Sequence, residues 1–287
     1  MAPASFGDRE YWDARYLKRR DDFEWLVPAT ALDSAIDAAV RNAKTKVESP
    51  RVIHLGCGTS SLSYHLRKFV ERPSQVNNVD FSGPAIEMCR ERERELFGGA
   101  EDGENGDRFE AMEWSVVDLL SATDITRLAP EGTPTYDVIV DKSTCDSVCC
   151  ADDVSMPASP LLRAVDVAPS DPEVAACPLV KSVHPLDMLG IGMAYVTPPG
   201  THWVALSYST SRFEDWFPNH GPPPPAWIRG ENNCLPHPAR LWELRSWEAM
   251  SVEQKDGKAE LGVHTPEIMH YLYILVRTDV RLAGGVL

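Results

Sequence analysis

Four short apolar segments, each ending near an acid or a glycine, constrain the fold of this chain more than any other feature. They are RVIHLG at 51–56, QVNNVD at 75–80, MEWSVVD at 112–118 and YDVIVD at 136–141. The first two precede SLSYHLRKFV and GPAIEMCRERERELF, in which apolar residues return at helical spacing. Strands that alternate with helical stretches predict a parallel sheet covered by helices on both faces.

Two later apolar runs extend this pattern. HWVALSYS at 202–209 and IMHYLYILVRT at 268–278 are separated by an irregular, proline-rich stretch. A late strand, a long excursion and a final strand predict an antiparallel hairpin at one edge of the sheet. Residues 151–180 contain five prolines and read as a long loop or lid, since loops of this length in compact domains are usually functional or disordered.

A glycine turn follows the first predicted strand. Gly56, Cys57 and Gly58 come directly after it, and Asp80 ends the second strand 24 residues beyond Gly56. An acid at that place can accept both hydroxyls of a ribose, while the glycines let the backbone approach the ligand. A Cβ atom would otherwise occupy that space. The arrangement predicts a site for a nucleotide-like ligand.

Two cofactor classes share this much of the pattern. In dinucleotide sites a third glycine lets the helix approach beside the pyrophosphate, but Ser61 stands at that position here. Asp118 falls where the adenine amino group of S-adenosylmethionine usually lies, and Asp141 falls near the reacting end of that cofactor. Three strand-end acids without a place for a pyrophosphate favour S-adenosylmethionine over a nicotinamide cofactor.

Six segments together resemble the class I methyltransferases related to elongation factor 1-alpha lysine methyltransferase 4. They are EYWDARY, EWL, LGCGTSSLSYHL, NNVDFS, VVDLL and VIVDKSTCDSV, which lie within residues 10–150; the strands at 202–209 and 268–278 match more faintly. The resemblance implies an α/β, Rossmann-like class I methyltransferase fold. It has a mostly parallel seven-stranded sheet, helices on both faces and an antiparallel edge hairpin.

The same resemblance suggests how the chain is organised. We expect a single methyltransferase domain over residues 1–287, with a cofactor-covering segment at 1–30. An insert or lid is expected at 151–180, and an irregular excursion at 210–260 before the last strand. The chain departs from the family pattern at Asp141, Cys145 and Thr59, where the family has glutamate, leucine and asparagine.

The resemblance also implies S-adenosyl-L-methionine as the cofactor, S-adenosyl-L-homocysteine as the product, and no metal. Trp12, Tyr16 and Trp25 match positions that close over the cofactor; alternatively, Trp12 and Tyr16 pack on the sheet from one helical face. Lys142 matches a position next to the cofactor, against the alternative of a solvated lysine. Asp141 is expected near the methyl acceptor or the methionine amine, unless it only caps the following helix. The predicted cofactor site comprises Trp12, Tyr16, Trp25, Gly56, Cys57, Gly58, Asp80, Phe81, Asp118, Leu119, Asp141 and Lys142.

The implied reaction is direct methyl transfer to a protein lysine, with elongation factor 1-alpha, a basic protein, as the partner. The formal charge of -15 suits a basic partner and argues against nucleic acid and anionic membranes. Seven cysteines without zinc-type spacing predict reduced thiols in the cytoplasm or nucleus. We expect a monomer and assign no catalytic base. A small-molecule methyltransferase and a cofactor-binding module without activity remain alternatives.

Overall fold

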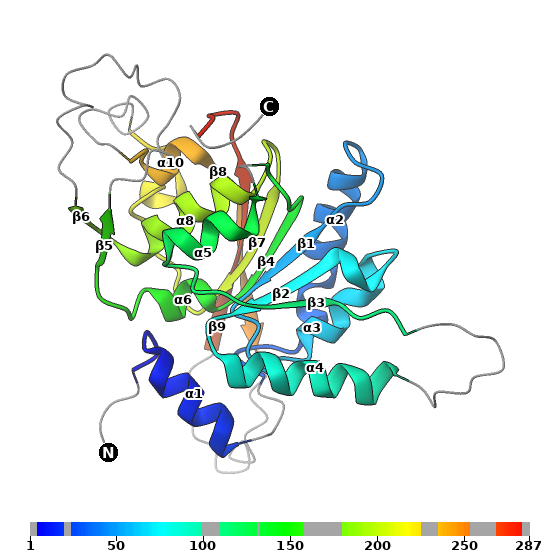
Figure 1. Cartoon of the computed structure of the whole chain (residues 1–287). Helices are drawn as coiled ribbons and strands as arrows, with labels where there is room; N and C mark the ends of the chain where they lie inside the picture. The colour runs from blue at the N-terminus through cyan, green and yellow to red at the C-terminus, as the bar shows by residue number, and fades with distance from the viewer. Residues whose placement is uncertain are drawn as a thin grey trace, which may run out of the picture.

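The computed structural model describes residues 5–19, 24–98, 109–130, 133–157, 180–224, 235–252 and 268–282. Seven strands form one sheet in the order β3-β2-β1-β4-β7-β9-β8 (Figure 1). Their bounds are β1 Val52–Leu55, β2 Val76–Asp80, β3 Glu113–Val116, β4 Val138–Lys142, β7 His202–Ser207, β8 Trp242–Val252 and β9 Ile268–Arg277. This is the mostly parallel Rossmann-like sheet that the apolar segments predict.

The first five strands of that order, from β3 to β7, run parallel. Val52 of β1 pairs with Val76 of β2 and with Val138 of β4, and His202 of β7 pairs with Val138. Strands β1, β2 and β4 are buried along their whole length. Parallel strands are buried on both faces because the crossover helices cover them.

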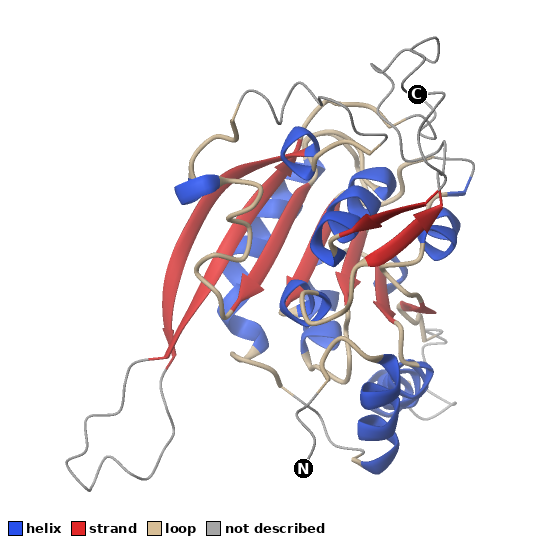
Figure 2. Cartoon of the chain, turned by 90° about the vertical axis from the view of Figure 1, so that its left-hand side faces the viewer, coloured by secondary structure: helices blue, strands red, loops and turns tan. Residues whose placement is uncertain are grey.

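Helices cover both faces of the sheet, as Figure 2 shows. Side chains alternate between the faces along a strand, so Val52 faces one core and Ile53 the other. The core that includes Val52 is built with α2 (Asp33–Lys44), α3 (Leu62–His65) and α4 (Gly83–Phe97); the core that includes Ile53 is built with α5 (Ala122–Leu128), α6 (Thr144–Val148) and α8 (Pro185–Val196).

The antiparallel edge differs in detail from the predicted hairpin. Strand β9 pairs antiparallel with β7 on one side and with β8 on the other. The excursion expected to be irregular at 210–260 therefore contains the edge strand β8, and the short helix α10 (Pro238–Leu241) before it. Strand β8 reads WELRSWEAMSV, and most of its side chains between 243 and 249 are exposed. An edge strand buries little, so its sequence lacks the apolar run that identifies a central strand.

Two further elements were not apparent from the sequence. Helix α8 is buried on all sides, so it lacks the amphipathic pattern by which surface helices are identified. Strand β5 (Val154–Pro157) lies within 151–180 and pairs antiparallel with β6 (Val180–Val183), which begins at the end of that range; residues 158–179 of the predicted insert lie outside the described residues.

The charged run on α4 is only partly a solvated surface. Arg90 and Arg92 form exposed ion pairs with Glu87 and Glu95. Glu93 is 1% exposed, however, and accepts a hydrogen bond of 2.7 Å from the Trp114 indole and one of 2.6 Å from Arg67. Glu93 therefore connects α4 to β3.

No helix in the described parts of the chain is long and apolar enough to cross a membrane.

Candidate functional site

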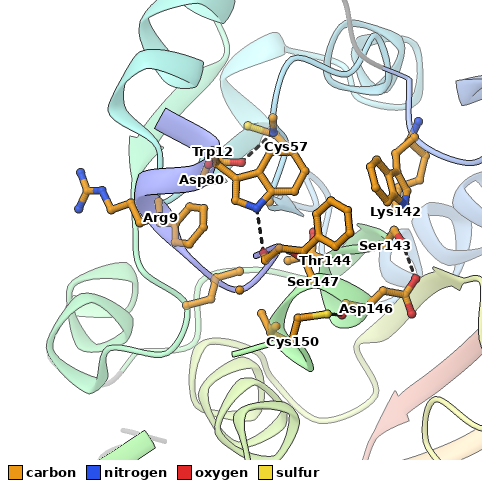
Figure 3. A pocket seen from close by; sticks show the side chains of 18 of the residues that line it. Arg9, Trp12, Cys57, Asp80, Lys142, Ser143, Thr144, Asp146, Ser147 and Cys150 are labelled. Atoms are coloured by element: carbon orange, nitrogen blue, oxygen red, sulfur yellow. Dashed lines mark hydrogen bonds between the residues drawn. The ribbon is translucent and has the colours of Figure 1, made fainter. Parts of the chain in front are cut away.

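A cavity of about 500 Å³ lies at the carboxyl ends of β1, β2 and β4 and beside the loop after β3. The N-terminal helix α1 (Arg9–Lys18) and the residues around it close it from one side (Figures 1 and 3). Eleven of the twelve predicted cofactor residues line it: Trp12, Tyr16, Trp25, Gly56, Cys57, Gly58, Asp80, Phe81, Asp118, Leu119 and Lys142. The structure thus brings together residues that are far apart in the sequence: Trp12 and Lys142 are separated by 130 positions.

The glycine turn has a structural reason within the protein itself. Gly56 and Gly58 both adopt a φ of +49°, which side-chain-bearing residues rarely adopt. A Cβ atom on Gly56 would collide with the Thr144 side chain, and one on Gly58 would lie 2.5 Å from the Tyr16 hydroxyl. The glycines therefore make room for two protein side chains. Both also line the cavity, and the close approach of a ligand to this turn stays a prediction.

Asp80 is fixed at this turn. One carboxylate oxygen accepts a hydrogen bond of 2.8 Å from the Gly58 amide, and the other accepts one of 2.8 Å from the Ser82 amide. Burial raises the pKa of Asp80 to about 6, against the lowering effect of those two bonds. Each carboxylate oxygen can still accept a further donor. The carboxylate is therefore placed, rigidly held and able to accept hydroxyl groups from the cavity.

The aromatic residues of the N-terminal segment pack on one another as well as facing the cavity. The rings of Trp12 and Tyr16 are stacked at 5.7 Å, and Phe6 contacts Trp25 edge-on at 5.3 Å. The Trp12 indole donates to the Phe6 carbonyl at 2.8 Å, as the dashed line from Trp12 in Figure 3 shows. The two interpretations of these aromatics are therefore compatible, because one cluster both closes on itself and forms a wall.

Lys142 is not a solvated lysine. Its side chain is 3% exposed and pairs with the Glu24 carboxylate, and its ammonium also donates to the Val27 carbonyl at 3.2 Å. Burial lowers the pKa of Lys142, while Glu24 opposes that shift. The last residue of β4 therefore supplies a cation at the cavity wall.

Asp141 does not line the cavity. It is fully buried, and its carboxylate accepts hydrogen bonds from the amides of Thr144 at 2.7 Å and Cys145 at 3.2 Å. Burial and then the nearby Asp146 raise the pKa of Asp141 to about 7. The structure thus places Asp141 as the cap of α6, which was the alternative to a role at the cofactor.

Asp146 lies in the cavity wall, and both of its carboxylate oxygens already accept hydrogen bonds from the protein. Its carboxylate accepts hydrogen bonds from Arg212 at 2.8 Å and from the Tyr208 amide at 3.1 Å, and also from the hydroxyls of Ser143 and Ser207. The acceptor positions of this carboxylate are therefore taken up by four protein donors. It holds Ser143 and Tyr208, two further lining residues, in place.

The loop after β3 supplies the remaining predicted residues. Asp118 lines the cavity, and one of its oxygens accepts a hydrogen bond of 2.9 Å from the Leu120 amide. Leu119 is 6% exposed and joins Phe81 in the lining. A carboxylate beside apolar side chains suits a planar base that carries an amino group.

His54 lies in β1, two residues before Gly56, and lines the cavity. It is 1% exposed, and its Nδ1 lies 3.1 Å from both Ser63 Oγ and Asn78 Oδ1. Burial lowers the pKa of His54 to about 4, so the ring is neutral at physiological pH. This part of the cavity wall is therefore polar but uncharged.

In the described ranges, no group of three or more His, Cys, Asp or Glu could hold a metal ion.

Sequence reasoning missed several residues of the site. Glu24 was present in the EWL segment but was not singled out. Tyr208 follows β7 and is 53% exposed at the cavity rim, and Phe6 precedes α1. Phe6 and Tyr208 come from segments with no local motif, so only the tertiary arrangement identifies them. Figure 3 shows Arg9, also in the lining, pointing away from the centre of the cavity.

The sheet order, with a cavity over the carboxyl ends of its parallel strands and an antiparallel edge hairpin, defines a Rossmann-like methyltransferase fold. No protein-family model matches the chain.

Comparison with curated proteins finds methyltransferase srdJ of Neurospora crassa, which is 31% identical over 150 residues. The alignment covers 52% of this chain and 56% of the relative, so the chain spans about half the length of the curated relative it matches.

Among solved structures, one from work on the conversion of a disulfide bond into a thioacetal group during echinomycin biosynthesis has a TM-score of 0.50. It is 15% identical, with 94% of this chain and 92% of that chain covered. A second, an S-adenosylmethionine-dependent methyltransferase from Anabaena variabilis, has a TM-score of 0.49 at 12% identity, covering 94% of each chain. The first similarity concerns the fold.

Proposed function

We propose that this chain is an S-adenosylmethionine-dependent methyltransferase. The observation that carries the proposal is the Asp80 carboxylate, which the glycine turn fixes while leaving acceptor capacity toward the cavity. This is the group that a ribose requires. The methyltransferase fold and the curated methyltransferase relative support the same activity.

The residues around the cavity suit each part of this cofactor. Asp80 would bind the ribose hydroxyls, and Asp118 with Leu119 and Phe81 would bind the adenine. Lys142 would bind the carboxylate of the methionine part. The faces of Trp12 and Tyr16 can attract a sulfonium by cation–π contact. When bound, the cofactor supplies an electrophilic methyl group, and the chain contributes orientation and exclusion of water.

As the acceptor we propose a protein lysine, of the elongation factor 1-alpha type. The resemblance of the N-terminal half and the formal charge of -15 support a basic partner. A lysine amine must lose its proton before it attacks the methyl carbon. Asp146 is saturated and Asp141 lies outside the cavity, so we assign no protein base and expect the amine to be deprotonated by solvent, favoured by burial of the lysine.

A small-molecule acceptor is the second candidate. The cavity volume of about 500 Å³ falls within the usual range for small-ligand sites. The segment around Phe6 and Gly7 also packs against the backbone of Cys150 and Ala151, which encloses this end of the cavity. Such an enclosure suits a compact acceptor as well as the tip of a lysine side chain.

Two experiments separate these proposals. Calorimetry should detect binding of S-adenosylhomocysteine and none of NADH; binding of NADH alone would refute the methyltransferase assignment. Incubation with methyl-labelled S-adenosylmethionine should then label protein in a proteome extract, and purified elongation factor 1-alpha in particular. Label appearing only on metabolites, also in an extract stripped of protein, would favour the second candidate.

A further inference from the structure

Glu24 joins the N-terminal segment to two different parts of the cavity. Its carboxylate pairs with Lys142 at the end of β4. It also accepts hydrogen bonds from the Ser61 amide and from the Ser60 hydroxyl, at 2.5 Å and 3.2 Å, where the glycine turn leads into α3. Although burial opposes it, the bonds from Lys142 and Ser61 hold the pKa of Glu24 below its ordinary value, so the group is ionised at neutral pH.

The position of Lys142 depends on this segment. A buried ammonium without a partner is strongly unfavourable. Among the residues that the structure describes, the ion pair of Lys142 is with Glu24, and its other acceptor is the carbonyl of Val27, three residues further along. Residues 24–27 therefore provide both of the groups that orient the one lysine in the cavity lining.

Glu24 itself is not part of the cavity lining, whereas its neighbour Trp25 is. Leu26, the next residue, has a φ of 69°, an unfavourable conformation for a leucine that persists only where surrounding contacts enforce it. The contacts of Glu24 and the bond from Lys142 to Val27 flank that residue on both sides. They are suited to hold the segment against the sheet.

We infer that Glu24 is a positioning residue of the cofactor site, which orients Lys142 and holds residues 24–27 and Trp25 over the cavity without contacting the cofactor. The inference rests on the proposed function, because it takes the cavity as the cofactor site. It assigns the EWL segment a role through its acid as well as through its tryptophan.

The test is a double-mutant cycle on S-adenosylhomocysteine affinity, measured by calorimetry for the wild type, Glu24→Gln, Lys142→Met and the double variant. Glu24→Gln keeps the size of the side chain and removes its charge. We expect it to weaken binding about tenfold or more, as for loss of a hydrogen bond to a charged group. In the Lys142→Met background the same change should cost clearly less, because the part of its effect that runs through Lys142 is already lost and only its hold on the segment remains to be lost.

Asp37→Asn is the matched control, since Asp37 forms an exposed ion pair of 2.9 Å with Arg41 on α2. It should leave affinity unchanged. Unchanged affinity in Glu24→Gln, or an equal loss in both backgrounds, would overturn the inference. A purely structural defect would appear in both backgrounds and in the circular dichroism melt of Glu24→Gln.

Limited trypsin digestion separates failure of the inference from failure of the proposed function. Lys18 and Arg19, at the end of α1, are exposed, and we expect faster cleavage there in ligand-free Glu24→Gln than in the wild type. If the wild type binds no S-adenosylhomocysteine, the proposed function fails and the cofactor role of Glu24 with it. If Glu24→Gln is cleaved at the wild-type rate, the inferred role of Glu24 in holding residues 24–27 in place is also overturned.

Discussion

The hydroxyl of Tyr16 lies 2.5 Å from the point that a Cβ atom on Gly58 would occupy. The glycine turn after β1 and the N-terminal helix are thus shaped to each other, although they lie far apart in the sequence. Tyr16 is 5% exposed and stacked on Trp12, so it cannot move aside freely. The residue type at position 58 therefore affects the N-terminal segment as well as the turn.

We expect Gly58→Ala to destabilise the fold by about 2–3 kcal/mol, from the cost of a positive φ together with the contact to Tyr16. Denaturant unfolding would measure this. Gly83→Ala is the matched control, because a Cβ atom there meets nothing within 4 Å, and it should be neutral or slightly stabilising. Adding Tyr16→Phe should recover part of the loss in Gly58→Ala; no recovery would mean that the backbone alone is responsible.

Ser143 lies at the cavity with a φ of 74°, and its hydroxyl donates to Asp146. Replacing it by alanine removes that hydrogen bond and keeps the unfavourable backbone, whereas glycine removes both. We therefore expect Ser143→Gly to be more stable than Ser143→Ala by about 1 kcal/mol in urea unfolding. An alanine variant as stable as the glycine variant would contradict the strain at this residue.

The affinity for S-adenosylhomocysteine should depend on pH through Asp80. Burial raises its pKa to about 6 in the ligand-free protein, and ribose hydroxyls need the ionised carboxylate as acceptor. Affinity should therefore be constant above about pH 7 and fall as the pH drops through 6. Calorimetry between pH 5 and 8 would measure this. In Asp80→Asn binding should be weaker and lose this pH dependence; a parallel slope in both proteins would assign it to another group.

Asp141 should affect stability more than cofactor binding. Its folded pKa of about 7 lies above the ordinary value of 3.8, so the folded state holds a proton that the unfolded state has released between about pH 4 and 7. This contribution to stability is present at low pH and is lost as the pH rises through 7. An asparagine oxygen can still accept the amide bonds at α6. Thermal unfolding of Asp141→Asn should therefore show a flatter pH profile and, at pH 8, a melting temperature at or above that of the wild type.

For Asp141→Asn, calorimetry with S-adenosylhomocysteine supplies the complementary measurement. Affinity close to that of the wild type at pH 8 is expected, since Asp141 does not line the cavity. A large loss of affinity with unchanged stability would return Asp141 to the cofactor site.

Much of the central sheet was predictable because its information is local. Strands β1, β2 and β4 are short, valine-containing segments that end near an acid or a glycine, and the helix after β2 has an amphipathic pattern with Ser82 capping its first turn at Ala85. The edge strand β8 and the buried helix α8 were missed. Their burial does not follow the pattern of a half-buried element, so tertiary packing determines them.

By itself, the sequence determined that a parallel sheet would place its strand-end acids and its glycine turn at one edge, because alternation of short apolar runs and helices permits little else. Tertiary structure decided which acids face the cavity. Asp80 and Asp118 face it. Asp141 does not, because the left-handed backbone at Ser143 lets α6 begin where its first amides donate hydrogen bonds to the Asp141 carboxylate. It also decided that Lys142 pairs with Glu24, 118 residues away. A buried charge needs a partner, but no local pattern records which distant residue the fold will bring to it.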